Sequence, residues 1–149
     1  MIPAAPLKLA RLNDYIDLWA KDRPDHAAMI QYEDEKTVSY KKFAQLIDFF
    51  ALRLMDMGIG HGDRVATQLV LVPEHMILMY ACFKIGAIIA PLDVRLQDDE
   101  VVRDINKIEP KAFFFLGNTP VRDFRTAGEA VCRKCPSVKH LVQFTPNPA

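Results

Sequence analysis

Cys132 and Cys135 form a Cys-x-x-Cys pair with two basic residues between the thiols and His140 shortly after it. Such a group could ligate a metal or exchange a disulfide, and the basic neighbours could lower a thiol pKa. A metal site would need a second ligand pair, which is missing, and a redox pair normally opens a helix, whereas this pair closes a predicted one. We therefore expect the cysteines to be structural. A Cys-x-x-Cys redox protein stays open as an alternative, and a low thiol pKa at Cys132 or Cys135 would indicate it.

The glycine-rich segment at residues 58–63 has a composition similar to that of a phosphate-binding loop. It follows a predicted helix and precedes a predicted strand. A nucleotide loop has the opposite order, because it must open a helix whose N-terminus faces the phosphate. We expect a helix end and a tight turn here.

Other titratable residues give no catalytic arrangement and no metal site. The adjacent acids at residues 98–100 cannot face one another on a helix, so we expect them to favour the start of one. The four histidines have no serine or cysteine placed to form a nucleophile and base, and we expect each on the surface or in a loop: His26, His61, His75 and His140. Cys82 lies in an apolar run and is expected in the core.

Arg95 is the charged residue best placed to bind a ligand. It follows an apolar strand that ends at residues 90–92, and open α/β sheets bind ligands at the carboxyl ends of their strands. A guanidinium there could hold a phosphate through its planar fork. The alternative is a surface arginine paired with Asp93 or Asp98.

The elements that would position these residues follow from apolar periodicity and from capping residues. In the first half we expect a helix at 13–22 capped by Asn13, and a hairpin of strands 28–32 and 37–40 around a solvated turn at 33–36. A long helix should follow from residue 41, with Ser39 as its cap and Gly58 as its stop.

In the second half strands and helices alternate. Expected strands are 64–72, 87–92, 111–116 and 140–144, the first two buried, and expected helices are 73–85, 98–107 and 123–135. Parallel neighbours need crossover connections, so this order predicts an α/β fold with a mostly parallel sheet flanked by helices. We expect one domain over 1–149, with a helix–hairpin–helix part at about 1–60, an alternating β/α part at about 63–145, and a linker beyond 145.

The composition limits the partners. With 19 basic and 19 acidic residues the formal charge is zero, which argues against binding nucleic acid. The apolar stretch at 69–92 is interrupted by Pro73, Lys84 and Pro91, so we expect no transmembrane segment. The N-terminus lacks the pattern of a signal peptide, which predicts a cytoplasmic protein.

Three strings in the same order carry a family resemblance: Thr-Val-Ser-Tyr at 37–40, Gly-Asp-Arg-Val-Ala at 62–66, and Lys-Ile-Gly-Ala-Ile-Ile-Ala-Pro-Leu-Asp at 84–93. Together they resemble the opening segment of AMP-forming acyl-CoA synthetases, over about residues 12–116. The resemblance implies a parent ligase that uses ATP and magnesium to form an acyl-adenylate from a carboxylic acid, and then transfers the acyl group to CoA, as in fatty acid metabolism.

The family's Ser/Thr-Gly-Thr-Thr-Gly-x-Pro-Lys loop, its Tyr-Gly-x-Thr-Glu segment and its C-terminal lysine have no counterpart in this sequence. The resemblance therefore implies an incomplete portion of the family's large N-terminal domain, inactive alone and without tight binding of ATP, magnesium or CoA. Only Arg95 has a functional match, as a contact to the phosphates of CoA, although Asp93 and Val94 replace the usual Asn-Pro before it. A second departure is Val72 before Pro73 and Glu74, where relatives commonly have asparagine and a small residue.

Two further expectations concern partners. Missing neighbours would leave apolar faces uncovered, so we expect the chain to form a homodimer or to swap elements with a second copy. The alternative function is a self-contained, non-catalytic α/β module that binds a ligand or another protein. A reading frame that continues into a phosphate loop would favour the ligase, and one that stops near residue 149 would favour the module.

Overall fold

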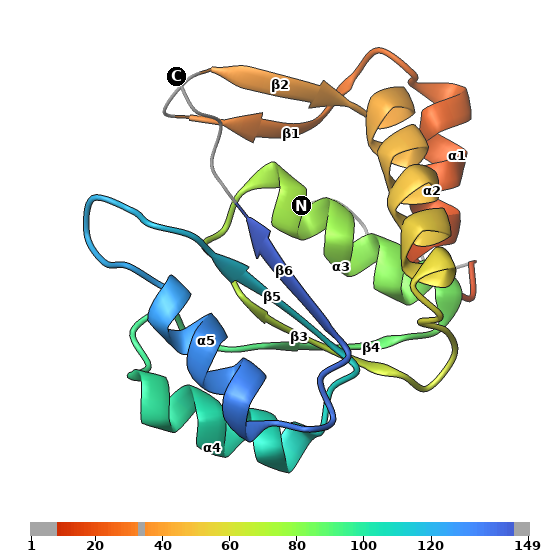
Figure 1. The fold of residues 1–149 in the computed structure, drawn as a ribbon. Helices are drawn as coiled ribbons and strands as arrows, with labels where there is room; N and C mark the ends of the chain where they lie inside the picture. Colours follow the sequence, from red (N-terminus) through yellow and green to blue (C-terminus); the bar gives the residue numbers. More distant parts are fainter. Residues whose placement is uncertain (1–8, 33–34, 145–149) are drawn as a thin grey trace, which may run out of the picture.

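The computed structural model describes residues 9–32 and 35–144, so part of the predicted hairpin turn and the predicted linker lie outside the described residues. Helices and strands alternate after an N-terminal helix, hairpin and helix (Figure 1). In chain order the elements are α1 (Leu12–Asp22), β1 (Ala27–Gln31), β2 (Lys36–Ser39), α2 (Tyr40–Asp56), β3 (Arg64–Gln68), α3 (Pro73–Ile85), β4 (Ile88–Pro91), α4 (Asp98–Ile108), β5 (Ala112–Leu116), α5 (Arg125–Lys134) and β6 (His140–Phe144).

The predicted α/β architecture is confirmed. Strands β3 to β6 form a parallel sheet in the order β4-β3-β5-β6, while β1 and β2 pair antiparallel in a separate hairpin. Figure 1 shows α4 and α5 on one face of the sheet, and α3 with α1 and α2 on the other. The connection after β3 runs through α3 and the one after β5 runs through α5, so adjacent strands leave the sheet toward opposite faces. This arrangement opens a crevice at their carboxyl ends.

The core is densest around β5, the strand whose five residues are all buried. It lies between β3 and β6, and the rings of Phe113 and Phe115 stack with centroids 5.4 Å apart. Helix α5 can approach this pair because residue 128 is glycine. A Cβ at that position would lie 2.5 Å from the Phe115 ring.

The helices α1 and α2 pack on α3 through a second apolar cluster of Ile16, Phe43, Ile47 and Ile77. Lys84 of α3 forms ion pairs with Asp17 of α1, at 3.5 Å, and with Asp48 of α2. The N-terminal helices are therefore held against the face of the sheet that α3 covers.

Several predicted helix ends are confirmed by their capping geometry. The Ser39 hydroxyl accepts a hydrogen bond from the Lys42 amide at 3.3 Å and so caps α2. Pro73 occupies the first turn of α3, and Gly86 closes that helix with a φ of 74°. A left-handed φ of this kind favours glycine.

Asn13 is not the cap of α1. Arg11 occupies that position, while Asn13 is buried and its amide donates to the Tyr80 carbonyl at 3.0 Å. A short polar residue near a helix start can serve either as a cap or as a buried donor. The tertiary contact with α3 decides between the two.

Two predicted strands were too long. The strand that begins at Arg64 ends at Gln68. Its last pair with β4 is Thr67 with Pro91, and beyond Gln68 the chain leaves the sheet to enter α3. The strand predicted over 87–92 is the shorter β4, which lies at the edge of the sheet, and Ile88 is 54% exposed. An apolar run does not distinguish a central strand from an edge strand. The last helix likewise begins two residues later than predicted, at Arg125.

Among the described residues, no helix combines the length and the apolar character needed to cross a membrane.

Candidate functional site

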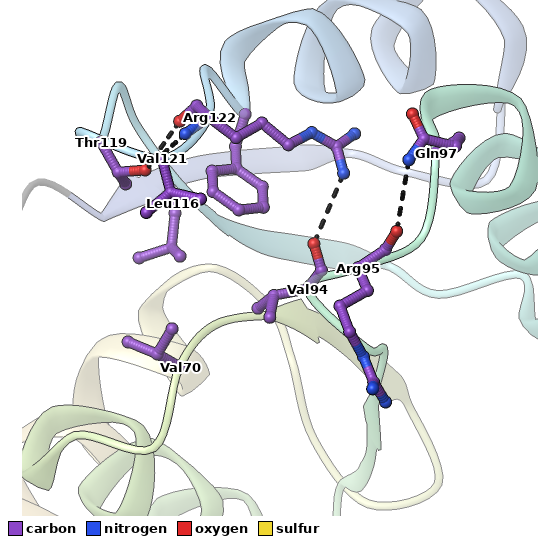
Figure 2. A pocket seen from close by; sticks show the side chains of 9 residues that line it. Val70, Val94, Arg95, Gln97, Leu116, Thr119, Val121 and Arg122 are labelled. Atoms are coloured by element: carbon purple, nitrogen blue, oxygen red, sulfur yellow. Dashed lines mark hydrogen bonds between the residues drawn. The ribbon is translucent and has the colours of Figure 1, made fainter.

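A cavity of about 650 Å³ lies at the carboxyl ends of the parallel strands (Figure 2). Val70 lines it from the loop after β3, residues 94–97 from the segment after β4, and residues 116–124 from the end of β5 and the loop after it. Its volume falls in the range of small-molecule pockets, roughly 300 to 1,000 Å³. It also lies at the switch point between β3 and β5, where open α/β sheets bind ligands.

The lining of the cavity is mainly apolar with a few polar groups. The apolar members are Val70, Val94, Leu116, Val121 and Phe124, and the polar ones are Arg95, Gln97, Thr119 and Arg122. A ligand with an apolar portion and an anionic group would match this combination.

Arg122 joins two walls of the cavity. Its guanidinium donates to the Leu96 carbonyl at 2.5 Å and to the Asp98 carboxylate at 2.6 Å, and it lies 5.0 Å from the Phe124 ring centroid. Figure 2 shows the side chain reaching from the loop after β5 toward Val94 in the segment after β4. Arg122 therefore holds the two loops together, and Asp98 balances its charge.

Arg95 is one of the residues that line the cavity, but its side chain extends away from Arg122 and Thr119 (Figure 2). The guanidinium forms a fork with Asp93, with Nε–Oδ1 at 3.0 Å and Nη2–Oδ2 at 2.5 Å. These hydrogen bonds, together with the Arg95 amide, lower the pKa of Asp93 to about 2. The structure thus contains the pairing that the sequence left open as an alternative.

The Arg95–Asp93 pair is largely open to solvent, with the arginine side chain 87% exposed. Exposed ion pairs contribute little free energy, so an anion with a higher charge could replace Asp93 as the partner of Arg95. Any such exchange would be weak, because Asp93 and Asp98 offset the charges of Arg95 and Arg122.

His75 was predicted in a loop or on the surface, and this prediction was wrong. The residue is buried in α3, with Nε2 3.0 Å from the Thr67 hydroxyl and Nδ1 3.2 Å from the Val70 carbonyl. A carbonyl can only accept, so Nδ1 carries the proton and Nε2 accepts from Thr67. Burial lowers the pKa of His75. The neutral ring fixes the loop that supplies Val70 to the cavity.

The sequence reasoning also missed Arg122, although a signal was present. Arg95 and Arg122 are both basic residues that follow the end of a parallel strand, β4 in one case and β5 in the other. His75 could have been recognised by its spacing, since it shares one helix face with Leu78 and Cys82, both buried.

The cysteine pair is divided between surface and interior at the end of α5. Cys132 is exposed, whereas Cys135 is buried, burial raises its pKa, and its thiol lies 3.8 Å from the Val102 carbonyl. Burial also raises the pKa of Cys82, to about 12. A raised pKa disfavours the thiolate, which argues against redox chemistry at Cys135. Within residues 9–32 and 35–144, no three histidine, cysteine or acidic residues are grouped so as to hold a metal ion.

The glycine-rich segment lies at the opposite end of the sheet from the cavity. It connects α2 to β3, as predicted, and Gly58 and Gly62 adopt φ values of 72° and 81°. The Gly60 amide donates to the Asp63 carboxylate at 2.9 Å, so the loop binds its own carboxylate.

The sequence matches a family model described as AMP-binding enzyme over residues 16–148. It is 32% identical over 105 residues to the medium-chain fatty-acid–CoA ligase of Escherichia coli, a match covering 70% of this chain and 18% of the ligase. It is 38% identical over 77 residues to the acetyl-coenzyme A synthetase of Sodalis glossinidius, covering 49% of this chain and 12% of the synthetase. The chain thus spans less than a fifth of the length of either relative.

Solved structures with the same fold include the N-terminal domain of FACL13 from Mycobacterium tuberculosis, with a TM-score of 0.81 at 22% identity, covering 91% of this chain and 34% of that one. A putative long-chain-fatty-acid CoA ligase from Rhodopseudomonas palustris gives a TM-score of 0.78 at 25% identity, covering 96% of this chain and 35% of that one. The parallel sheet and the hairpin therefore form an arrangement that recurs in longer chains.

Proposed function

Because the chain belongs to the AMP-binding enzyme family, we propose that it is an N-terminal part of an AMP-forming acyl-CoA synthetase. The whole enzyme would activate a carboxylic acid with ATP and magnesium and pass the acyl group to CoA. The observation that carries this proposal is the family match over residues 16–148, together with relatives named as CoA ligases.

The contribution of this chain to that reaction is architectural. Its described residues contain neither a glycine-rich loop that follows a strand and opens a helix nor a cluster of carboxylates suited to magnesium. In this proposal residues outside this chain bind ATP and magnesium, and no step of adenylate formation is assigned to residues of this chain.

In this proposal a phosphate of CoA binds at the rim of the cavity. The Arg95 side chain is exposed and its partner is the exposed carboxylate of Asp93, so an anion could compete with Asp93 for the guanidinium. The Arg122–Asp98 contact holds the segment that carries Arg95 in place. In this proposal Arg95 is the residue that contacts a phosphate, and Arg122 positions the loop.

Pyrophosphate release tests the proposal that this chain has an architectural role and that other parts of the enzyme catalyse adenylate formation. The chain is incubated with ATP, magnesium, CoA and a panel of carboxylic acids, beside a complete relative as the positive control. We expect release only from the relative. Acid-dependent release by this chain would contradict the architectural role.

The proposed partners follow from the same assignment. The acid and CoA would meet the chain within the larger enzyme, in the cytoplasm. Exposed apolar side chains, among them Leu52 and Leu71 at 62% and 83% exposure, support the proposal of a homodimer.

A further inference from the structure

Helix α2 has one face in the core and one face in solvent. Phe43, Ile47 and Leu54 are buried on the inner face and anchor the helix against its neighbours. Residues of the outer face follow one another at alternating intervals of three and four, which is the spacing of a coiled-coil seam. They are Lys42, Gln45, Phe49, Leu52 and Asp56, all of them exposed.

The centre of this outer face is apolar. Phe49 and Leu52 are 52% and 62% exposed, and the neighbouring Met55 is 57% exposed. The inner face is fixed, so these side chains cannot turn into the core. The Arg53 guanidinium lies 5.3 Å from the Phe49 ring centroid and covers only part of it. Large apolar side chains gathered in this way usually mark a contact with another molecule.

The ends of the outer face have opposite charges. Lys42 lies in the first turn of α2 and Asp56 is its last residue. Asp56 also lies 3.7 Å from Arg53, but both side chains are largely exposed, so that pair is weak. When two copies of the helix lie antiparallel with the axis at Phe49, each Lys42 faces Asp56 of the second copy. The surface is therefore complementary to itself.

We propose that this outer face of α2 is a homodimer interface, in which two copies pair antiparallel about Phe49. The two phenylalanine rings meet at the axis, Leu52 packs beside Gln45 of the second copy, and a lysine–aspartate pair closes each end. This pairing does not depend on the ligase activity, and it gives the proposed self-association a defined location.

The size of the outer face of α2 limits the affinity expected between the two copies. Helix α2 has 17 residues and is about 26 Å long. A contact along one helix buries less than the roughly 1,200 to 2,000 Å² of a standard interface, so the dimer should be weak and dependent on concentration.

Charge reversal tests the antiparallel pairing without weakening the helix. Lys42→Glu places an acid in the first turn, three residues after the Ser39 cap, and Asp56→Lys places a base in the last turn; both suit the helix dipole. Sedimentation equilibrium from micromolar to millimolar concentration should show a dimer for the unmodified chain. Each reversal alone creates two like-charge contacts and should raise the dissociation constant about tenfold. The double variant should restore it.

Two further variants separate this surface from others. Leu52→Glu should abolish the dimer, whereas Ile30→Glu, at a 69% exposed position in β1, should leave it unchanged. A chain that stays monomeric at every concentration would overturn the proposal. A dimer would also contradict the proposal if its dissociation constant did not change in the single charge reversals, or if the double variant did not restore it. Such a dimer would form through another surface.

Discussion

Replacing Arg122 by methionine should lower the free energy of unfolding by about 2 kcal/mol. The change removes two short charged hydrogen bonds, to Leu96 and Asp98, a longer one of 3.4 Å to the Val94 carbonyl, and a contact with the Phe124 ring, while the longer part of the side chain stays packed. Such hydrogen bonds contribute roughly 1.5 to 3 kcal/mol each when buried. The arginine and aspartate side chains are 22% and 37% exposed, so we take about 1 kcal/mol for each of the two short bonds and count nothing for the long one to Val94.

Urea unfolding followed by circular dichroism measures the effect. With a slope of about 2 kcal/mol per molar urea, the midpoint should fall by about 1 M. Arg125→Met is the matched control. Arg125, the first residue of α5, pairs with Asp123, but its side chain is 53% exposed against 22% for Arg122, so the midpoint of this variant should barely move. Equal midpoints for the two variants would refute the claim that Arg122 holds the cavity loops together.

Three other predictions concern buried groups. Burial lowers the pKa of His75 below 6.5, so the neutral ring stabilises the folded protein fully above pH 6.5, and this stabilisation is lost as the pH falls below that value. His75→Gln should therefore make the free energy of unfolding, measured in urea titrations between pH 7.5 and 5.5, decline less toward low pH. Gly128→Ala should destabilise the protein by about 1 kcal/mol in thermal unfolding, since the clash with Phe115 outweighs the gain in helix propensity; a more stable variant would contradict this packing. In a thiol titration of the folded protein only Cys132 should react quickly, and fast reaction of a second thiol would show that Cys135 or Cys82 is not buried.

Helices with complete local signals could be predicted from the sequence. In α2 the apolar spacing agrees with a serine cap at Ser39, and in α3 Pro73 and Gly86 mark the two ends. These signals lie within the elements themselves, so tertiary contacts were not needed to interpret them. The same reasoning gave the alternation that produces a parallel sheet.

Features that depend on distant contacts could not be predicted in this way. Asn13 bonds to Tyr80, and Arg122 bonds to Leu96 in the segment after β4, across large separations in sequence. The edge position of β4 depends on how all the strands of the sheet are ordered, and the sequence of its own four residues does not indicate it. Arg95 was located correctly beyond a strand end, but its role at a phosphate stays a prediction.

Ligand mapping by NMR on the labelled chain tests the central claim most directly. The account predicts that millimolar CoA shifts amide signals near Arg95 and Arg122, that Arg95→Ala removes these shifts, and that ATP with magnesium shifts nothing comparable. Tight binding of ATP, or CoA shifts that are unaffected by Arg95→Ala, would contradict it.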